Sequence, residues 1–239
     1  MGNGEWGIDG PAIHSPFPIP NSPFKMRYNM IFDLPTSLDV GGKSWAINSD
    51  FRDVLRTLTA FEDPDVTDEE KAFICLHNTY PDFDDMPQRD LQAAFDAAIA
   101  FIDHGSAGDG RPSPRTMDWT QDANLIFPAV NRVAGFEVRG VDYMHWWTFM
   151  GYFMEIRDTT YATILGLRGK KARGKKLEKD EKEFWNHNRG LCELKTRYTE
   201  EEIAEIERLK ALVDGGGPPS RGGFADFPEI LRDFRAENL

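Results

Sequence analysis

The chain of 239 residues contains only two cysteines, Cys75 and Cys192, and they lie far apart in segments with helical patterns. Two isolated cysteines form neither a zinc-binding pattern nor a disulfide framework. Long hydrophobic runs are also missing, since Asp142, His145 and Glu155 interrupt the longest aromatic stretch, which is too short to span a bilayer. The first residues lack the basic and apolar segments of a secretory signal. We therefore expect reduced thiols, no membrane span and a cytoplasmic protein.

Basic residues are scarce as well. The chain has 28 Lys and Arg against 40 Asp and Glu, which gives a formal net charge of −12. Such a charge repels nucleic acids and anionic membranes at long range, so binding of this kind would need a local patch. The basic run 168–179 is the candidate patch, but acidic residues follow it from Glu178 onward and cancel most of its field. We predict that this run is a solvated loop, and nucleic-acid binding through it stays the alternative.

Patterns for catalysis and metal binding are absent from the sequence. The five histidines form no pair at helical ligand spacing, and no HExxH motif, Glu-x-x-His pair or cysteine cluster occurs. His145 follows Asp142 by three residues, as in a carboxylate-oriented imidazole, yet nothing completes a site, so we interpret it as part of a polar helix stripe. The segment 166–171 lacks two required residues of a phosphate loop. We predict no catalytic, cofactor or metal residues, with an overlooked small helical enzyme as the alternative.

The segment 142–156 contains two of the six tryptophans and three of the eight methionines. Its apolar residues recur at helical spacing and cover most of the circumference, and Asp142 is a suitable N-cap. A helix of this kind must be surrounded by protein. We predict that it is the central core helix, with an aromatic binding surface as the alternative, and that its structural residues are Trp146, Trp147, Met150 and Phe153.

The N-terminal part changes character near residue 30. Residues 1–29 are rich in Gly and Pro, which predicts a flexible arm, although Met26 and Met30 leave a later natural start open. Alternating apolar residues then flank Gly41-Gly42, and this pattern predicts a β-hairpin. An isolated hairpin is only marginally stable. We therefore expect it to pack on helices through Leu38, Val40, Trp45 and Ile47.

Helical periodicity predicts four helices between the hairpin and the aromatic helix. The first is capped by Asn48 or Ser49, the second opens at Thr67 with a capping box, the third runs from Pro87 to His104, and the fourth runs from Asp118 to Gly135. The apolar residues expected on the first two are Phe51, Val54, Leu55 and Leu58, and then Phe73, Ile74 and Leu76 with His77. Residues 105–114 are predicted to form a loop.

Beyond the basic run, residues 178–198 and 199–213 are expected to form one long helix or two in series, followed by a Gly/Pro linker. The last amphipathic segment places four apolar residues on one helical face, and these are the predicted partner-binding residues: Phe227, Ile230, Leu231 and Phe234. Docking of this face on its own domain is the alternative. The fold is predicted to be mainly α, with a helical domain at 30–198 that carries the hairpin and a C-terminal region at 199–239.

Four stretches together resemble the bacteriophage Gp-fifteen family, whose genes lie beside the tape-measure gene in the tail-morphogenesis region. They are Asp33-Leu34-Pro35 with the hairpin and residues 47–52, the acidic start 65–71, Asp118-Trp119-Thr120-Gln121-Asp122-Ala123, and Tyr143-Met144-His145-Trp146-Trp147-Thr148-Phe149. Thr148 departs from the lysine usual in the family. The resemblance implies a non-enzymatic tail assembly chaperone in the host cytoplasm, with the tape-measure protein and other tail proteins as partners.

Overall fold

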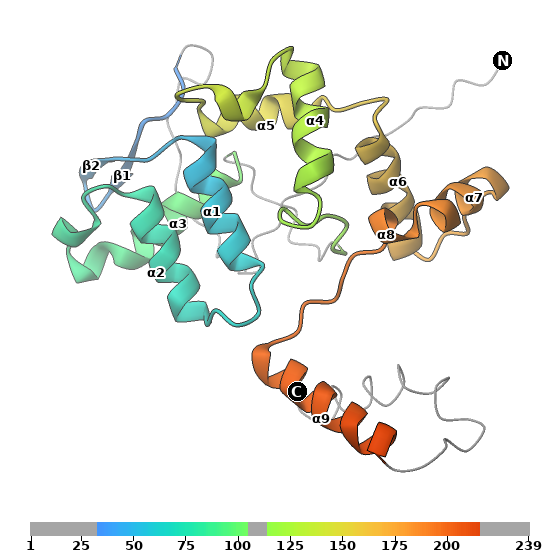
Figure 1. Ribbon diagram of the computed structural model, residues 1–239. Helices are drawn as coiled ribbons and strands as arrows, with labels where there is room; N and C mark the ends of the chain where they lie inside the picture. Colours follow the sequence, from blue (N-terminus) through green and yellow to red (C-terminus); the bar gives the residue numbers. More distant parts are fainter. Residues whose placement is uncertain (1–32, 105–113, 216–239) are drawn as a thin grey trace. The chain divides into compact units, whose positions relative to one another are not determined.

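The computed structural model describes residues 33–104 and 114–215, with side chains as far as residue 210. The chain divides into two compact units, with the boundary between Thr196 and Arg197. The described ranges are mainly helical with a two-stranded antiparallel hairpin (Figure 1), so the predicted fold class is confirmed. The predicted arm 1–29, nearly all of the predicted loop 105–114 and the predicted partner-binding segment 227–234 lie outside the described residues. Within the described ranges, no helix is both long and apolar enough to cross a membrane.

The predicted hairpin is confirmed. Strand β1 (Ser37–Val40) pairs with β2 (Lys43–Ala46), with Leu38 opposite Trp45. Gly41 and Gly42 make the turn with φ values of 60° and 82°, a backbone region that glycine adopts without steric cost. The hairpin packs on α3 (Leu91–Ile102), and the residues expected to face the helices are all buried: Leu38, Val40, Trp45 and Ile47.

Helices α1 (Phe51–Phe61) and α2 (Asp68–Thr79) follow, with two corrections. The N-cap of α1 is Asp50 rather than Asn48 or Ser49, because Ser49 and Asn48 accept and donate bonds to other segments. The capping box between Thr67 and Glu70 is confirmed. Of the four residues named for α2, only Leu76 is buried, and Phe73 and His77 are exposed.

The third predicted helix begins later than expected. Short 3₁₀ helices η1 (Phe83–Asp85) and η2 (Gln88–Asp90) precede α3, so the predicted start at Pro87 is wrong for the α-helix. The turn that begins at Pro87 has the tighter hydrogen-bond pattern of a 3₁₀ helix, between residues i and i+3. The Asp90 amide donates to the Pro87 carbonyl at 2.8 Å. The α-helical hydrogen-bond pattern therefore starts at Leu91.

The fourth and fifth helices also begin after their predicted starts. Helix α4 (Ala123–Ala134) starts five residues after Asp118, whose side chain accepts hydrogen bonds from the next backbone amides and closes a separate turn. Gly135 ends α4 with φ of 81°, as predicted. After η3 (Val138–Gly140), α5 spans Trp146–Met154, so Asp142 is not its N-cap.

Long-range backbone pairing explains the late start of α5. The Trp146 amide donates to the Ser49 carbonyl at 2.7 Å, and the Phe51 amide donates to the Met144 carbonyl at 2.9 Å. Asp50 and His145 form an antiparallel bridge between these bonds. The chain before Trp146 is therefore extended, and the helix can begin only beyond it.

The basic run is not a solvated loop along its whole length, because α6 (Thr160–Ala172) continues into it. Arg168 is 4% exposed and forms a bidentate ion pair with Asp122, with donor–acceptor distances of 2.6 and 2.9 Å. Its remaining N–H groups donate to the carbonyls of Thr116, Leu191 and Cys192. One guanidinium thus joins α6 to the start of α4 and to the segment around Cys192.

The expected helix at 178–198 ends early. It is replaced by α7 (Lys179–His187), α8 (Arg189–Cys192) and a non-helical stretch to Thr199. In the second unit, α9 (Glu200–Gly215) begins at the predicted capping signal, since Thr199 and Glu202 exchange two hydrogen bonds of 2.9 and 3.0 Å.

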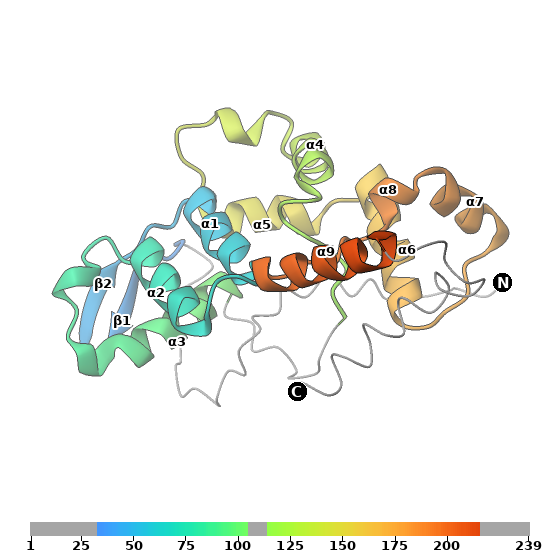
Figure 2. The same cartoon turned by 60° about the horizontal axis from the view of Figure 1, so that its bottom comes forward.

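The first unit contains a large hydrophobic core and a smaller one. The large core joins the hairpin to helices α1–α5 and to Tyr161 at the start of α6, and Figure 2 shows α3 beside the hairpin. The smaller core is formed by Ile164, Leu167, Trp185 and Cys192 where α6, α7 and α8 meet. The Arg168–Asp122 pair lies between elements of the two cores.

Replacing Arg168 with alanine should therefore destabilise the first unit strongly. The change leaves Asp122 charged and buried without its partner, and breaking a buried pair in this way costs about 3–5 kcal/mol. Urea unfolding of the variant measures the loss. Lys176→Ala is the matched control, because Lys176 belongs to the same basic run but is exposed. Equal stability of the two variants would contradict the structural role of Arg168.

Candidate partner-binding surface

Two tryptophans of α5 close the C-terminal end of α3. The last carbonyls of a helix have no partner within the helix. The Trp146 indole Nε1 donates to the Ile102 carbonyl at 2.9 Å, and the Trp147 Nε1 donates to the Phe101 carbonyl at 2.8 Å. Met150 and Phe153 lie in the same core, 1% and 3% exposed. The structure therefore places all four predicted core residues in the hydrophobic core.

His145 is the N-cap of α5 and not part of a polar stripe. Its Nδ1 accepts a hydrogen bond from the Trp147 amide at 3.0 Å, so the proton lies on Nε2, which donates to the Pro35 carbonyl at 2.8 Å. Burial lowers the pKa of the imidazole, while the bond to Pro35 opposes this shift. Both ring nitrogens are thus occupied by structural bonds, and Asp142 does not orient the ring.

Asp103 and His104 follow α3 near the two tryptophans, and both have shifted pKa values. Burial raises the pKa of the Asp103 carboxyl to about 7, and its Oδ1 has no hydrogen-bond partner within the described residues. The His104 ring stacks on Trp146 at a centroid distance of 6.2 Å and lies tilted against Trp147 at 5.4 Å, and burial lowers its pKa. Perturbed groups of this kind occur at functional sites and in structural clusters.

A surface aromatic cluster lies on α2 and η1, and we call Phe73, His77 and Phe83 the α2 cluster. Phe73 is 55% exposed, and its ring lies 5.8 Å from His77 and 5.6 Å from Phe83, measured between centroids. The His77 and Phe83 rings are 6.4 Å apart. The three side chains therefore form one continuous aromatic surface, whereas the inward face of α2 is supplied by Cys75, Leu76 and Thr79.

The sequence pattern contained a signal for this surface. Phe73 and His77 are four residues apart and share one helical face, while Cys75, Leu76 and Thr79 recur on another. Cys75, Leu76 and Thr79 are enough to form the inward face of α2, so Phe73 and His77 are left for the surface. The ring contacts to Phe83 could not be found from periodicity, because Phe83 belongs to a separate 3₁₀ helix.

The structure describes no metal centre. Among the described residues, no group of three or more His, Cys, Asp or Glu side chains is arranged to hold a metal ion. Cys75 and Cys192 are buried free thiols, and burial raises the pKa of Cys75 to about 12. A thiol with such a pKa remains protonated at neutral pH and is a poor nucleophile and metal ligand.

The most distinctive stretches of the sequence meet in the core. Trp119 of the stretch 118–123 packs against Trp146 with ring centroids 6.3 Å apart, and against Phe153 at 5.3 Å. Residues 49–51 pair with residues 144–146 through backbone hydrogen bonds. These stretches, far apart in the sequence, therefore lie together in the folded first unit.

A model of the family described as Bacteriophage Gp15 protein matches residues 30–194. The chain belongs to this bacteriophage family. The match confirms the resemblance seen in the sequence and covers the elements from β1 to α8, but not α9. Searches of curated proteins and of solved structures found no match.

The raised pKa of Asp103, at the end of α3, predicts that the stability of this Gp15-family protein depends on pH. Burial raises the pKa of the Asp103 carboxyl from the ordinary value of 3.8 to about 7 in the folded protein. The unfolded chain therefore loses this proton at a lower pH than the folded protein does, and the free energy of unfolding falls as the pH rises from 3.8 to about 7. Asp103→Asn should therefore raise the unfolding temperature by several degrees at about pH 8 and change it little at about pH 4. Thermal unfolding followed by circular dichroism measures both values. A shift of equal size at the two pH values would show that the Asp103 carboxyl does not titrate as described.

Proposed function

We propose that this Gp15-family protein is a non-enzymatic tail assembly chaperone that binds the tape-measure protein and keeps it soluble while the tail is built. Membership of a bacteriophage family supports a role in the phage life cycle. The sequence resemblance supports tail morphogenesis, because it implies a gene beside that of the tape-measure protein. The partner is expected to expose apolar helical segments before the tail tube covers them.

The α2 cluster is the observation that carries this proposal. Exposed and contiguous aromatic surfaces on soluble proteins mark interaction sites. An amphipathic helix can place its apolar face on such a surface. Phe73 is more than half exposed and touches two other rings, so a bound helix would cover aromatic surface already ordered by ring contacts.

Charge around the α2 cluster indicates the kind of helix that it would bind. Glu69 and Glu70 lie one turn before Phe73 on α2, and Asp84 and Asp85 follow Phe83, and all four are exposed. Acidic residues around an apolar centre favour a partner with basic residues beside its apolar ones, because complementary charge steers the encounter and fixes its register. We propose a basic amphipathic segment of the tape-measure protein as the ligand.

The C-terminal residues Phe227, Ile230, Leu231 and Phe234 stay a second proposed contact for the same partner. Their spacing on one face suits binding to an apolar helix. They lie outside the described residues, so the proposal for the α2 cluster does not depend on them.

Co-expression with the tape-measure protein tests the proposal. Phe73→Ser should reduce the soluble yield of the partner several-fold, because the change removes the centre of the α2 cluster. Its effect on stability should be within about 0.5 kcal/mol, as for most surface substitutions. The soluble fraction of the partner is measured after centrifugation of the lysate.

Met154→Ser is the matched control, since Met154 is also 55% exposed but lies on α5. The control should leave the partner soluble. Equal yields with both variants would exclude the α2 cluster as the binding surface. If deletion of residues 216–239 alone reduced the yield, the chaperone contact would lie in the C-terminal segment instead.

A further inference from the structure

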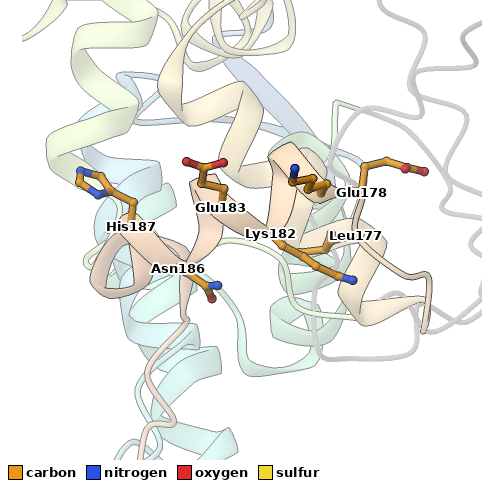
Figure 3. Close-up of a pocket in the computed structure, with 7 residues that line it drawn as sticks. Leu177, Glu178, Lys182, Glu183, Asn186 and His187 are labelled. Carbon is orange, nitrogen blue, oxygen red and sulfur yellow. The ribbon is translucent and has the colours of Figure 1, made fainter.

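A basic depression lies where the end of α6 faces α7 and α8. Its volume is ≈ 410 Å³, and it is lined by Lys171, Lys175, Lys182 and Arg189 around Trp185, with Glu193 as the one acidic residue. We call it the basic pocket. A neighbouring depression of ≈ 780 Å³ shares Leu177, Lys182 and Asn186 with it (Figure 3). In a chain of net charge −12, this collection of cations is unusual.

Local backbone structure brings these lysines together. Gly174 adopts φ of 68° after α6, and the Lys175 amide then donates to the Lys170 carbonyl at 2.9 Å. This turn places Lys175 beside Lys171, while Lys182 comes from α7. The Lys171 ammonium lies 4.0 Å from the centre of the Trp185 ring, a cation–π contact that fixes one wall.

The acidic residues after the basic run do not neutralise the basic pocket as expected from the sequence. Glu181 bonds to the Glu178 amide in a capping box and forms an ion pair with Lys170, which does not line the pocket. Arg189 pairs with Glu193 at 2.7 Å. Within the described part of the chain, Lys175 and Lys182 have no ion pair, so two cations are available to a ligand.

The surroundings favour a short acidic ligand over a nucleic acid. Trp185 is only 8% exposed and belongs to the smaller core, so its ring is not available for base stacking. Glu178 and Glu183 line the neighbouring depression and would repel a longer polyanion, as would the net charge of the chain. Lys175 and Lys182 lie close enough in one small pocket to favour a short segment that carries several carboxylates.

We propose that the basic pocket binds a short, carboxylate-rich peptide segment of a partner protein, through Lys175 and Lys182. The proposal concerns the chemistry of this pocket and stands independently of the chaperone role. It also separates two kinds of contact on this protein: the α2 cluster suits a basic amphipathic helix, and the basic pocket suits an acidic segment.

Fluorescence anisotropy of the full chain with a labelled hexaglutamate peptide tests the proposal. The double variant Lys175→Ala/Lys182→Ala should weaken binding by roughly tenfold, because it removes the two pocket cations that, among the described residues, are held by neither an ion pair nor a ring contact. Lys176→Ala is the matched control and should bind as the wild type does, since Lys176 is adjacent and exposed but does not line the pocket. Unchanged unfolding temperatures show that each variant is folded.

Four results would overturn the proposal, the last of them a competition by inorganic phosphate. One is hexaglutamate binding that the double variant leaves unchanged, and another is no measurable binding by the wild type. The third is tighter binding of a single-stranded oligonucleotide of equal charge, which would assign the pocket to nucleic acid. Inorganic phosphate should displace the peptide only when it is in large excess, which supports a peptide site. If phosphate displaced the peptide at an equal concentration, the pocket would be a simple anion site.

Discussion

The first unit depends on two indole N–H groups that cap the end of α3. Trp146 and Trp147 donate to the carbonyls of Ile102 and Phe101, which fixes α5 against α3. The same tryptophan, Trp146, packs on Trp119 and Phe149, and its backbone amide bonds to Ser49. Trp146 of α5 therefore contacts the end of α3 and the segments that precede α1 and α4. Burial of such large aromatic side chains contributes strongly to stability because each removes a large apolar area from water.

Local patterns in the sequence predicted the elements well. The glycine pair gave the hairpin, the Thr67 capping box gave the start of α2, and Gly135 gave the end of α4, because each signal is complete within a few residues. The start of α5 could not be predicted in this way. It depends on backbone bonds to Ser49 and Phe51, nearly a hundred residues earlier in the chain.

The roles of the charged residues in the basic run were the hardest feature to predict from the sequence. Arg168 begins a run of basic residues and gives no local sign of burial, since its partner Asp122 lies 46 residues away. Within the same run, Lys170 forms an ion pair with Glu181, whereas Lys171 and Lys175 line the pocket around Trp185. Apolar residues lie on both sides of α2, so its inward face could be found only from the separate recurrence of Cys75, Leu76 and Thr79.

The distinctive residues of this Gp15-family chain thus stabilise the fold, and its candidate binding surfaces lie elsewhere. Trp119, Trp146 and Trp147 are buried, whereas the α2 cluster and the basic pocket are formed by residues outside the aromatic helix. This arrangement keeps the candidate binding surfaces apart from the residues of the core. A substitution at the surface can change binding without the loss of the core.

Hydrogen–deuterium exchange of the full chain, with and without the tape-measure protein, tests this separation most directly. Binding at the α2 cluster should slow amide exchange in residues 71–85 and leave exchange in residues 146–154 unchanged. Slower exchange confined to residues 146–154 would contradict the account, because it would place the partner on the helix that we assign to the core.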